Sequence, residues 1–313
     1  MVTKMSMKNS ENRTVFAVDI GGSKLLSGLV LSNGKVLDVV RNELKPDITT
    51  GTLESLILEA WNKLKKTHSD RLPFACGITI PGVADVERGM WTYACFSGIS
   101  DYPVVFHMER HLGIPVYIEN DGNACAWAEK AFGVCQDCDD FMWITVSNGV
   151  GAGIVLNGKL YRGFWEGAGE FGHLIIEPGG RMCPCGHRGC MEAMAAGPGI
   201  SARYEKKTGH CLSAKEIGER ARAGEEDALQ VIRDTGIYLG RGLGKAACLL
   251  NLQRYVLGGG VMQSLDLIEE PLRRTFHEEA FARPNQEAEI MKTGLGYEAA
   301  LLGAAAIAFH PVL

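Results

Sequence analysis

An internal repeat constrains the fold of this chain more than any other feature of its sequence. The segment LVLSNGKVL (residues 29–37) returns 124 residues later, at residues 153–161, as GIVLNGKLY. Each copy follows an apolar strand, at residues 14–20 or 141–147, that runs into glycines, and each contains the Asn-Gly pair typical of a tight hairpin turn. The repeat therefore predicts two similar halves, each opening with a strand meander whose first turn is rich in glycine.

Helices and strands are expected to alternate in the rest of each half. Further strands are predicted at residues 25–31, 35–41, 75–80, 115–119, 154–156 and 254–257, and helices at residues 53–68, 104–112, 124–132 and 298–309. Meanders followed by this alternation predict an α/β or mixed-sheet fold with a ligand in a cleft between two domains. We expect a smaller N-terminal α/β domain over residues 14–120, completed by the C-terminal segment 298–313, and a larger α/β domain over residues 121–297.

The composition disfavours several classes of partner. With a net charge of −5 and no run of five or six basic residues, nucleic acid is not expected to be the main partner. No apolar run is long enough to cross a membrane, and residues 1–13 are polar without the apolar core of a signal peptide, which predicts a disordered tail on a cytoplasmic protein. The ten cysteines are then expected to be reduced thiols and metal ligands. Cys135 and Cys138 have ligand spacing, but incidental thiols are favoured because no second pair lies near them.

A short cysteine-rich loop predicts a metal site. Cys183, Cys185 and Cys190 form the pattern C-x-C-x4-C, and His173 lies ten residues before the first of them. Three thiolates and one imidazole suit tetrahedral Zn2+, and because they fill all four positions the site is expected to be structural and closed to water. His187 is the rival fourth ligand, disfavoured because a tight loop would turn it outward. Buried cysteines and a core histidine without a metal are the remaining interpretation.

Two carboxylates are expected to gather at this loop. Glu170 lies three residues before His173, and Glu192 two residues after Cys190, so a metal bound by both ligands would draw the carboxylates toward one place. The second ring nitrogen of a metal-bound histidine normally bonds an acceptor, and a ligand hydroxyl can take that part. This group predicts a site for a molecule rich in hydroxyl groups, with solvated loop charges as the alternative.

Three glycine turns at strand ends predict a phosphate site, because glycine exposes backbone N–H groups without a side chain in the way. The literal G-x-G-x-x-G at residues 167–172 is rejected as a dinucleotide fingerprint, since no strand precedes it and the strand-like HLII follows. A nucleotide held between two hairpin loops remains, with Mg2+ held through water by an aspartate and the last turn against the adenosine; tight turns without a ligand are the alternative. The residues assigned to the nucleotide and its metal ion are Asp19, Gly21, Gly22, Ser23, Lys24, Gly149, Val150, Gly151, Gly258, Gly259 and Gly260.

The motifs, taken in order, resemble those of the ROK family, which comprises bacterial sugar kinases, N-acetylmannosamine kinases and sugar-responsive repressors. They are DIGGSK, PG at residues 81–82, ENDGNACAWAE, GVGAG, GEFGH, CPCGHRGCMEA and VLGGGV, and they cover nearly the whole chain from Thr14. The resemblance implies an actin-like ATPase fold of the hexokinase type (a duplicated RNase H-like fold), with two domains, ATP in the central cleft and commonly a homodimer. It implies that Asp121 is the catalytic base and that His173, Cys183, Cys185 and Cys190 bind zinc. The sugar contacts that it implies are Gly82, Asn120, Asp121, Glu170, His173 and Glu192.

Two positions depart from the family's pattern. Asn148 stands in the second phosphate loop where a small or hydroxyl residue is usual, and Ser23 stands in the first loop where threonine is common. Serine keeps the hydroxyl group, and the backbone N–H of Asn148 can still serve a phosphate oxygen.

The leading hypothesis is an ATP-dependent hexose kinase with Mg2+ and a structural Zn2+. Glucose is the favoured sugar, and an N-acetylhexosamine or another aldohexose is the neighbouring choice. Asp121 takes the proton of the sugar hydroxyl as that oxygen attacks the γ-phosphorus, although a plain helix cap is an alternative role for it. A sugar-responsive regulator would need a DNA-binding domain before Val15, where 14 residues stand. An inactive sugar sensor is disfavoured because Asp19, Asp121 and Glu170 are all present.

Overall fold

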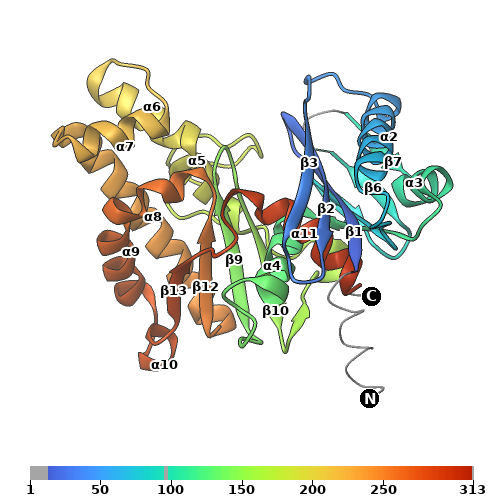
Figure 1. Ribbon diagram of the computed structural model, residues 1–313. Coiled ribbons are helices and arrows are strands. Elements are labelled where there is room, and N and C mark those ends of the chain that lie inside the picture. The colour runs from blue at the N-terminus through green and yellow to red at the C-terminus, as the bar shows by residue number, and fades with distance from the viewer. Residues whose placement is uncertain (1–12, 95–97, 312–313) are drawn as a thin grey trace. The chain divides into compact units, whose positions relative to one another are not determined.

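The computed structural model describes residues 13–94 and 98–311, so the expected disordered tail lies outside the described residues except for Arg13. The chain forms two compact units. The first contains residues 1–137, 159–168 and 294–313, and the second contains residues 138–158 and 169–293. Figure 1 labels the elements of both. Within the described ranges, no helix has the length and apolar character that crossing a membrane requires.

The first unit is built on a five-stranded sheet of order β3-β2-β1-β4-β8. Its strands are β1 (Thr14–Ile20), β2 (Lys24–Leu31), β3 (Val36–Glu43), β4 (Cys76–Ile80) and β8 (Val116–Asn120). The first three form the antiparallel meander predicted from the repeat, whereas β1, β4 and β8 run parallel. Because parallel strands end at the same edge of a sheet, the carboxyl ends of β1, β4 and β8 lie together.

Helices and a small sheet complete the first unit. They are α2 (Thr50–Thr67), α3 (Val104–Leu112), α4 (Asp121–Phe132), α11 (Ala299–Phe309), the 3-10 turns η1 (Phe164–Glu166) and η4 (Gly296–Glu298), and the strands β5 (Val83–Asp85), β6 (Met90–Tyr93) and β7 (Ser100–Tyr102). The alanine-rich α11 packs tightly on the main sheet, since a Cβ at Gly77 of β4 would lie 1.8 Å from the carbonyl oxygen of Ala304. This C-terminal helix lies in the same unit as the N-terminal strands, with which the sequence pattern grouped it.

The second sheet repeats the meander and has the order β11-β10-β9-β12-β13. Its strands are β9 (Phe141–Val146), β10 (Val150–Leu156), β11 (Lys159–Leu160), β12 (Arg254–Gly258) and β13 (Glu289–Lys292). The sequence pattern predicts that the glycines of residues 149–153 interrupt the strands. Instead, β10 already begins at Val150, with Gly151 opposite Thr145 and Gly153 opposite Trp143. The turn is limited to residues 147–149, because antiparallel pairing with β9 holds the later glycines extended.

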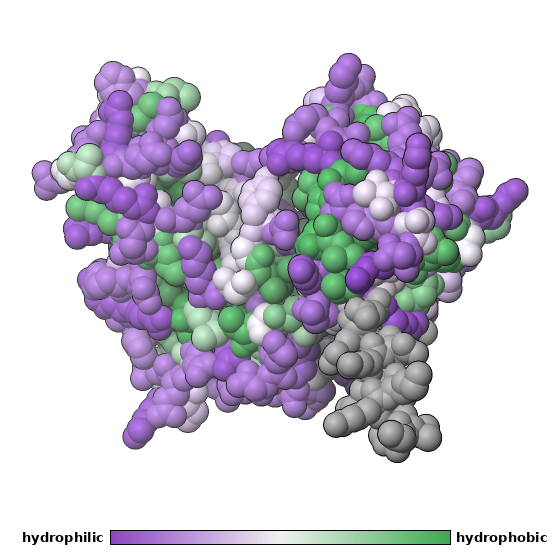
Figure 2. Space-filling model, in the orientation of Figure 1, coloured by the Kyte–Doolittle hydropathy of each residue, from purple (hydrophilic) through white to green (hydrophobic). Residues whose placement is uncertain are grey.

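Helices of the second unit pack closely where their contact faces carry glycine. The elements are α5 (Met191–Ala195), α6 (Gly197–Thr208), α7 (Ala214–Arg222), α8 (Glu226–Leu250), α9 (Leu265–Glu279), α10 (Arg283–Gln286), η2 (Phe171–His173) and η3 (Gly260–Ser264). A Cβ at Gly236 or Gly240 of α8 would lie 2.5 Å from a carbonyl oxygen of α9. On the face drawn in Figure 2, the outer sides of α6 to α9 are mostly hydrophilic.

Each unit has its own hydrophobic core. Tyr204, Tyr255 and Phe276 are buried in the core of the second unit, and Phe16 and Trp91 are buried in the first. The division between the units falls after residue 137, whereas the sequence pattern placed a domain boundary after residue 120. Helix α4 therefore belongs to the first unit, where its apolar side chains pack with those of α11.

Candidate active site

The carboxyl ends of the parallel strands in the first unit bring polar side chains together. Asp19 of β1 pairs in register with Thr79 of β4, and Thr79 pairs with Glu119 of β8. The Thr79 hydroxyl donates to Asp19 Oδ1 over 2.9 Å. Burial raises the pKa of Asp19 to about 6; the charge of Asp121 acts in the same direction, and the bond from Thr79 opposes it. Thr79 was not predicted as a site residue, although a hydroxyl side chain in the apolar strand CGITI was a usable signal.

Asn120 and Asp121 lie where β8 passes directly into α4. Asn120 is the N-cap, because its Oδ1 accepts the backbone N–H groups of Gly122 and Asn123 at 2.8 and 3.3 Å. The sequence pattern predicts a helix start near Ala124 with Asp121 as a candidate cap. The helix instead begins at Asp121, since Asn120 already supplies the capping oxygen. Asp121 therefore occupies the first helical position, where the helix dipole favours a negative charge.

Gly82 is held beside Asn120. The side-chain amide of Asn120 donates from Nδ2 to the carbonyl oxygen of Gly82 over 2.8 Å. Gly82 has a φ of 94°, and a Cβ there would lie 2.1 Å from the carbonyl oxygen of Tyr93, so only glycine fits. The first unit thus brings Gly82, Asn120 and Asp121 into one group.

The first glycine turn lies between β1 and β2. Gly22 and Ser23 are exposed, and the N–H of Gly21 donates to the carbonyl oxygen of Lys24 over 2.8 Å. The Lys24 ammonium group donates to the hydroxyl of Tyr297 over 3.0 Å. The backbone of Gly22 and Ser23 is accessible to a ligand, whereas the side chain of Lys24 is directed toward Tyr297.

The second glycine turn is held from two sides within the second unit. The N–H of Gly197 donates to the carbonyl oxygen of Ser147 over 2.8 Å, and the N–H of Val150 donates to Glu192 Oε2 over 3.1 Å. A Cβ at Gly149 would lie 2.6 Å from that same carboxylate oxygen. Glu192, which the resemblance assigns to the sugar, therefore also supports this turn, and it engages the Val150 N–H that was assigned to the nucleotide.

A cavity of about 530 Å³ opens beside the second turn. Ser147 and Asn148 line it from the turn, and Gly260 lines it from the start of η3. The preceding Gly259 has a φ of 91°, and a Cβ there would lie 2.4 Å from the carbonyl oxygen of Val146, so the ends of β12 and β9 approach closely. The volume lies in the range of small-molecule sites.

The rest of the cavity wall comes from α6 and α7. Lys215, Glu219 and Arg222 of α7 line it, and Arg222 forms an ion pair with Asp266 at 2.7 Å. These side chains were not predicted from the sequence, because α7 carries no ligand-binding motif and only tertiary packing brings it to the end of β12.

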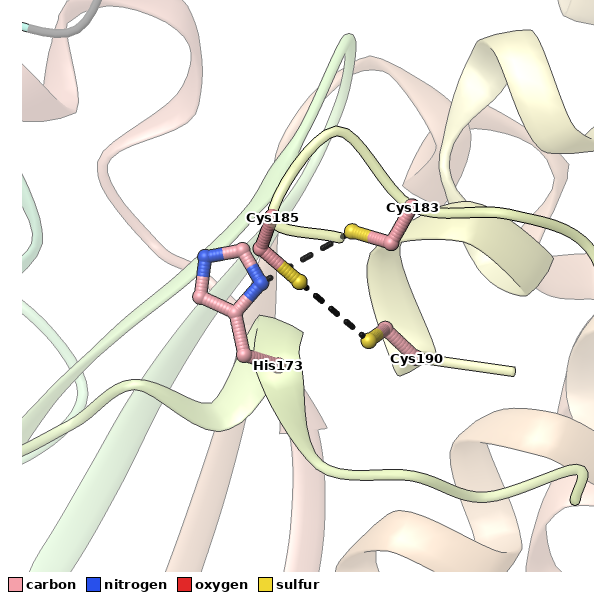
Figure 3. A group of neighbouring side chains, drawn as sticks. All are labelled: His173, Cys183, Cys185 and Cys190. Carbon is pink, nitrogen blue, oxygen red and sulfur yellow. Dashed lines mark hydrogen bonds between the residues drawn. The ribbon is translucent and has the colours of Figure 1, made fainter. Parts of the chain in front are cut away.

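The four predicted metal ligands lie together in the second unit (Figure 3). The ligand atoms of His173, Cys183, Cys185 and Cys190 all lie within 4.8 Å of one another. His173 Nδ1 is 3.8 Å from Cys183 Sγ, and Cys185 Sγ is 3.6 Å from Cys190 Sγ. Tetrahedral Zn–S bonds of about 2.3 Å place sulfur atoms about 3.8 Å apart, so this donor set fits Zn2+. The rival ligand His187 has its Nδ1 3.6 Å from Cys185 Sγ but lies outside the group of four.

The three thiols of this group differ in acidity. Bonds from the backbone and side chain of His187 lower the pKa of Cys185 to about 6. Burial raises the pKa of Cys190 to about 12 and also raises that of Cys183. Because thiolates are the ligating form, a bound cation would favour the deprotonated state of all three.

The other ring nitrogen of His173 faces away from the sulfur atoms. His173 Nε2 lies 3.7 Å from Glu170 Oε2, and the two side chains are 41% and 67% exposed. Glu192 Oε1 lies 4.0 Å from Cys183 Sγ. His173 therefore presents one nitrogen to the thiols and the other to Glu170 and solvent, where a ligand hydroxyl can reach it.

The remaining cysteines form no second metal group within the described ranges. Cys135 and Cys138 are both buried. Their interpretation as incidental thiols stays a prediction.

Two sheets that each open with an antiparallel meander, together with acidic residues at parallel strand ends, are the features of an actin-like ATPase of the hexokinase type. The chain belongs to the ROK family, which it matches over residues 15–310. The family resemblance drawn from the motifs is thus confirmed.

Individual relatives within this family include sugar kinases. The chain is 30% identical to a glucokinase of Streptomyces coelicolor, over 94% of this chain and 97% of the relative. It is 34% identical to an N-acetylmannosamine kinase of Escherichia coli O127:H6, over 94% and 98%. The structure of a ROK family glucokinase from Streptomyces griseus in complex with glucose and AMPPNP is similar with a TM-score of 0.80 and 30% identity, over 95% of this chain and 99% of that one.

Proposed function

We propose that the protein transfers the γ-phosphoryl group of ATP to a hydroxyl group of a hexose, with glucose as the first candidate. The observation that carries this proposal is the position of Asp121, which begins α4 beside Asn120 and Gly82 and lies close enough to Asp19 to raise its pKa. A base, a sugar-binding amide and a second carboxylate then share one sheet edge. The glucose and AMPPNP bound by the Streptomyces griseus glucokinase support this choice of substrates.

The proposed mechanism assigns proton transfer to Asp121. Its carboxylate accepts the proton of the sugar hydroxyl as that oxygen attacks the γ-phosphorus, and Asn120 and Gly82 orient the sugar. Ionised Asp19 would hold Mg2+ through water. The metal ion, when bound, supplies positive charge against the phosphoryl oxygens.

The nucleotide is proposed to use the cavity of the second unit. Its volume of about 530 Å³ and its position beside Asn148 and Gly260 suit the adenosine part. Backbone N–H groups of the glycine turns, those of Gly22, Ser23 and Gly149, are proposed to donate to phosphate oxygens.

A structural zinc ion is proposed for the Cys3His group. The interatomic distances fit a tetrahedral ion, and four protein ligands leave no position for a reacting water. The role proposed for the ion is to fix the loop that carries Glu170 and Glu192. Metal analysis of the purified protein is expected to find about one zinc per chain.

N-acetylmannosamine is the second candidate sugar. The observation in its favour is the 34% identity to an N-acetylmannosamine kinase over 98% of that relative. The deciding experiment measures sugar-dependent ADP release from Mg-ATP with glucose, mannose, N-acetylglucosamine and N-acetylmannosamine at equal concentrations. The highest kcat/KM identifies the sugar. Zinc-loaded, folded protein that releases no ADP with any of these sugars would contradict the kinase proposal.

Homodimeric assembly and a cytoplasmic location remain proposals based on the resemblance. Light scattering is expected to give about twice the chain mass of 33.9 kDa. A mass equal to that of one chain would contradict the dimer.

A further inference from the structure

The buried carboxylate of Glu119 receives N–H groups from two sides. Glu119 precedes Asn120 at the end of β8, and its side chain is 1% exposed. Its Oε1 accepts the backbone N–H of Asn120 at 3.0 Å and Nδ2 of Asn123 at 3.1 Å. Its Oε2 accepts Nε and Nη2 of Arg162 at 2.8 and 2.7 Å. The buried charge is therefore both paired and hydrogen-bonded, the condition under which such a charge is tolerated.

These bonds form a clamp around the two residues proposed to act on the sugar. Glu119 lies on the strand, whereas Asn123 lies in the first turn of α4, so the bond between them spans Asn120 and Asp121. The same carboxylate fixes the backbone N–H of Asn120. The direction in which Asp121 leaves the strand thus depends on where the Glu119 carboxylate is held.

Arg162, which is far from Glu119 in the sequence, contributes to this clamp from a turn whose two ends are hydrogen-bonded to each other. The N–H of Ala168 donates to the carbonyl oxygen of Arg162 over 2.9 Å, and Gly163 adopts a φ of 71°. Glu166 Oε2 lies 3.4 Å from Arg162 Nε, on the same turn. The turn and Glu166 therefore hold the guanidinium group that bonds Glu119. Because this group is planar, it bonds a carboxylate in a fixed orientation.

We infer that Arg162 and Asn123 are positioning residues: through Glu119 they hold Asn120 and Asp121 in the orientation that phosphoryl transfer needs. This inference rests on the proposed function for its effect on turnover. The residues touch neither substrate in this scheme. Loosening them misplaces the base and lowers kcat, while the nucleotide cavity in the other unit keeps its shape.

A substitution at Asn123 can distinguish a positioning role from a purely stabilising one. Its side chain is buried, and within the described residues its Oδ1 has no hydrogen-bond partner. An unpaired buried acceptor is unfavourable, so Asn123→Ala removes one hydrogen bond and one unpaired oxygen together. Losing the hydrogen bond lowers the free energy of unfolding, whereas losing the unpaired oxygen raises it, so the two effects oppose each other. The clamp nevertheless loses its contact with α4.

The test compares Asn123→Ala and Arg162→Lys with a control, Arg254→Lys. Arg254, at the start of β12 in the second unit, is also a largely buried arginine, 8% exposed, and its Nε lies 2.6 Å from Oε2 of Glu289 in β13. We expect kcat to fall about ten- to a hundredfold in both clamp variants. The dissociation constant of ADP should stay within about twofold of wild type, and melting temperatures should fall no further than in the control. The control should keep its kcat.

Kinetic results that would overturn the inference are a kcat within about twofold of wild type in Asn123→Ala, or an equal loss of kcat in Arg254→Lys. If Arg162→Lys does not fold, Asn123→Ala decides. Amide hydrogen exchange gives a readout independent of turnover, with faster exchange expected at residues 120–123 and unchanged exchange in the rest of β8. An absence of kinase activity in the wild-type protein would refute the proposed function but not the clamp. Unchanged exchange at residues 120–123 in both clamp variants would refute the clamp but not the proposed function.

Discussion

Asp121 is the single residue on which the proposed chemistry depends most. Asn120 already caps α4, so Asp121→Asn should leave the cap intact while removing the group that accepts the proton. We expect a folded protein with a near-normal melting temperature, a modest change in sugar affinity, and a kcat lower by about 10²–10⁴-fold. Steady-state kinetics and calorimetric binding measure these values. Turnover within about threefold of wild type would remove Asp121 from the mechanism.

Asp19 should make the ligand-free protein sensitive to pH. Its folded pKa of about 6 exceeds the value of 3.8 for an unperturbed aspartate, so between these values the folded protein holds the proton more tightly than the unfolded chain does. This side chain therefore lowers the free energy of unfolding as pH rises from about 4 to above 6. Asp19→Asn should become more stable relative to wild type across that range, by roughly 3 kcal/mol, in urea unfolding. A stability difference that does not vary with pH would contradict the raised pKa.

The turn between β9 and β10 leads to a prediction about nucleotide binding. Gly149→Ala places a methyl group 2.6 Å from Glu192 Oε2, so the turn must shift. We expect a KM for ATP at least about tenfold higher, with a smaller loss of sugar affinity in the ATP-free protein, because Glu192 is also proposed to contact the sugar. Gly51→Ala is the matched control, because a Cβ at Gly51 meets no atom within 4 Å. Equal loss of both ligands would indicate misfolding and leave the turn without a nucleotide role.

The cysteine loop leads to a prediction about zinc. Cys185→Ser removes one of four ligands, and we expect the purified protein to lose zinc together with sugar affinity, because the loop holds Glu170 and Glu192. Cys211→Ser serves as the control, since Cys211 is exposed and lies outside the ligand group. Metal analysis and calorimetric titration with the sugar measure both effects. Full sugar affinity in zinc-free protein would contradict the assignment.

Local patterns were enough to predict the strand meanders and the Cys3His group. Alternation, Asn-Gly turns and cysteine spacing are properties of neighbouring residues, and the structure confirms the meanders and the gathering of the four ligands. The bonds from Arg162 to Glu119 and from Val150 to Glu192 join residues 43 and 42 positions apart. No local rule relates such partners, so neither bond was predicted. The start of α4 was placed too late because Asn120 and Asp121 are both good caps.

Among the described residues, the three large clusters of core residues each lie within one unit. Two of these clusters belong to the first unit and the third belongs to the second. We therefore expect calorimetry to resolve two unfolding transitions. ADP is proposed to bind the cavity of the second unit. It should therefore increase the free energy of unfolding of that unit, by about 2.7 kcal/mol at a hundredfold excess over its Kd, and shift only that unit's transition to a higher temperature. A single transition that ADP shifts as a whole would show that the two cores unfold together.

The packing of α11 against β1 and β4 has a consequence for biosynthesis. The strands β1, β4 and β8 leave the ribosome before the second unit does, whereas the helix that covers them, residues 299–309, leaves after it. At about 5–20 residues per second, the nascent strands wait many seconds with one apolar face uncovered. The second core, built from residues 142–290, is complete before that helix is translated. Translation stopped before Ala299 should therefore yield a chain whose first unit is cleaved rapidly by protease while the second resists, so that the last unit to begin synthesis is the first to be finished.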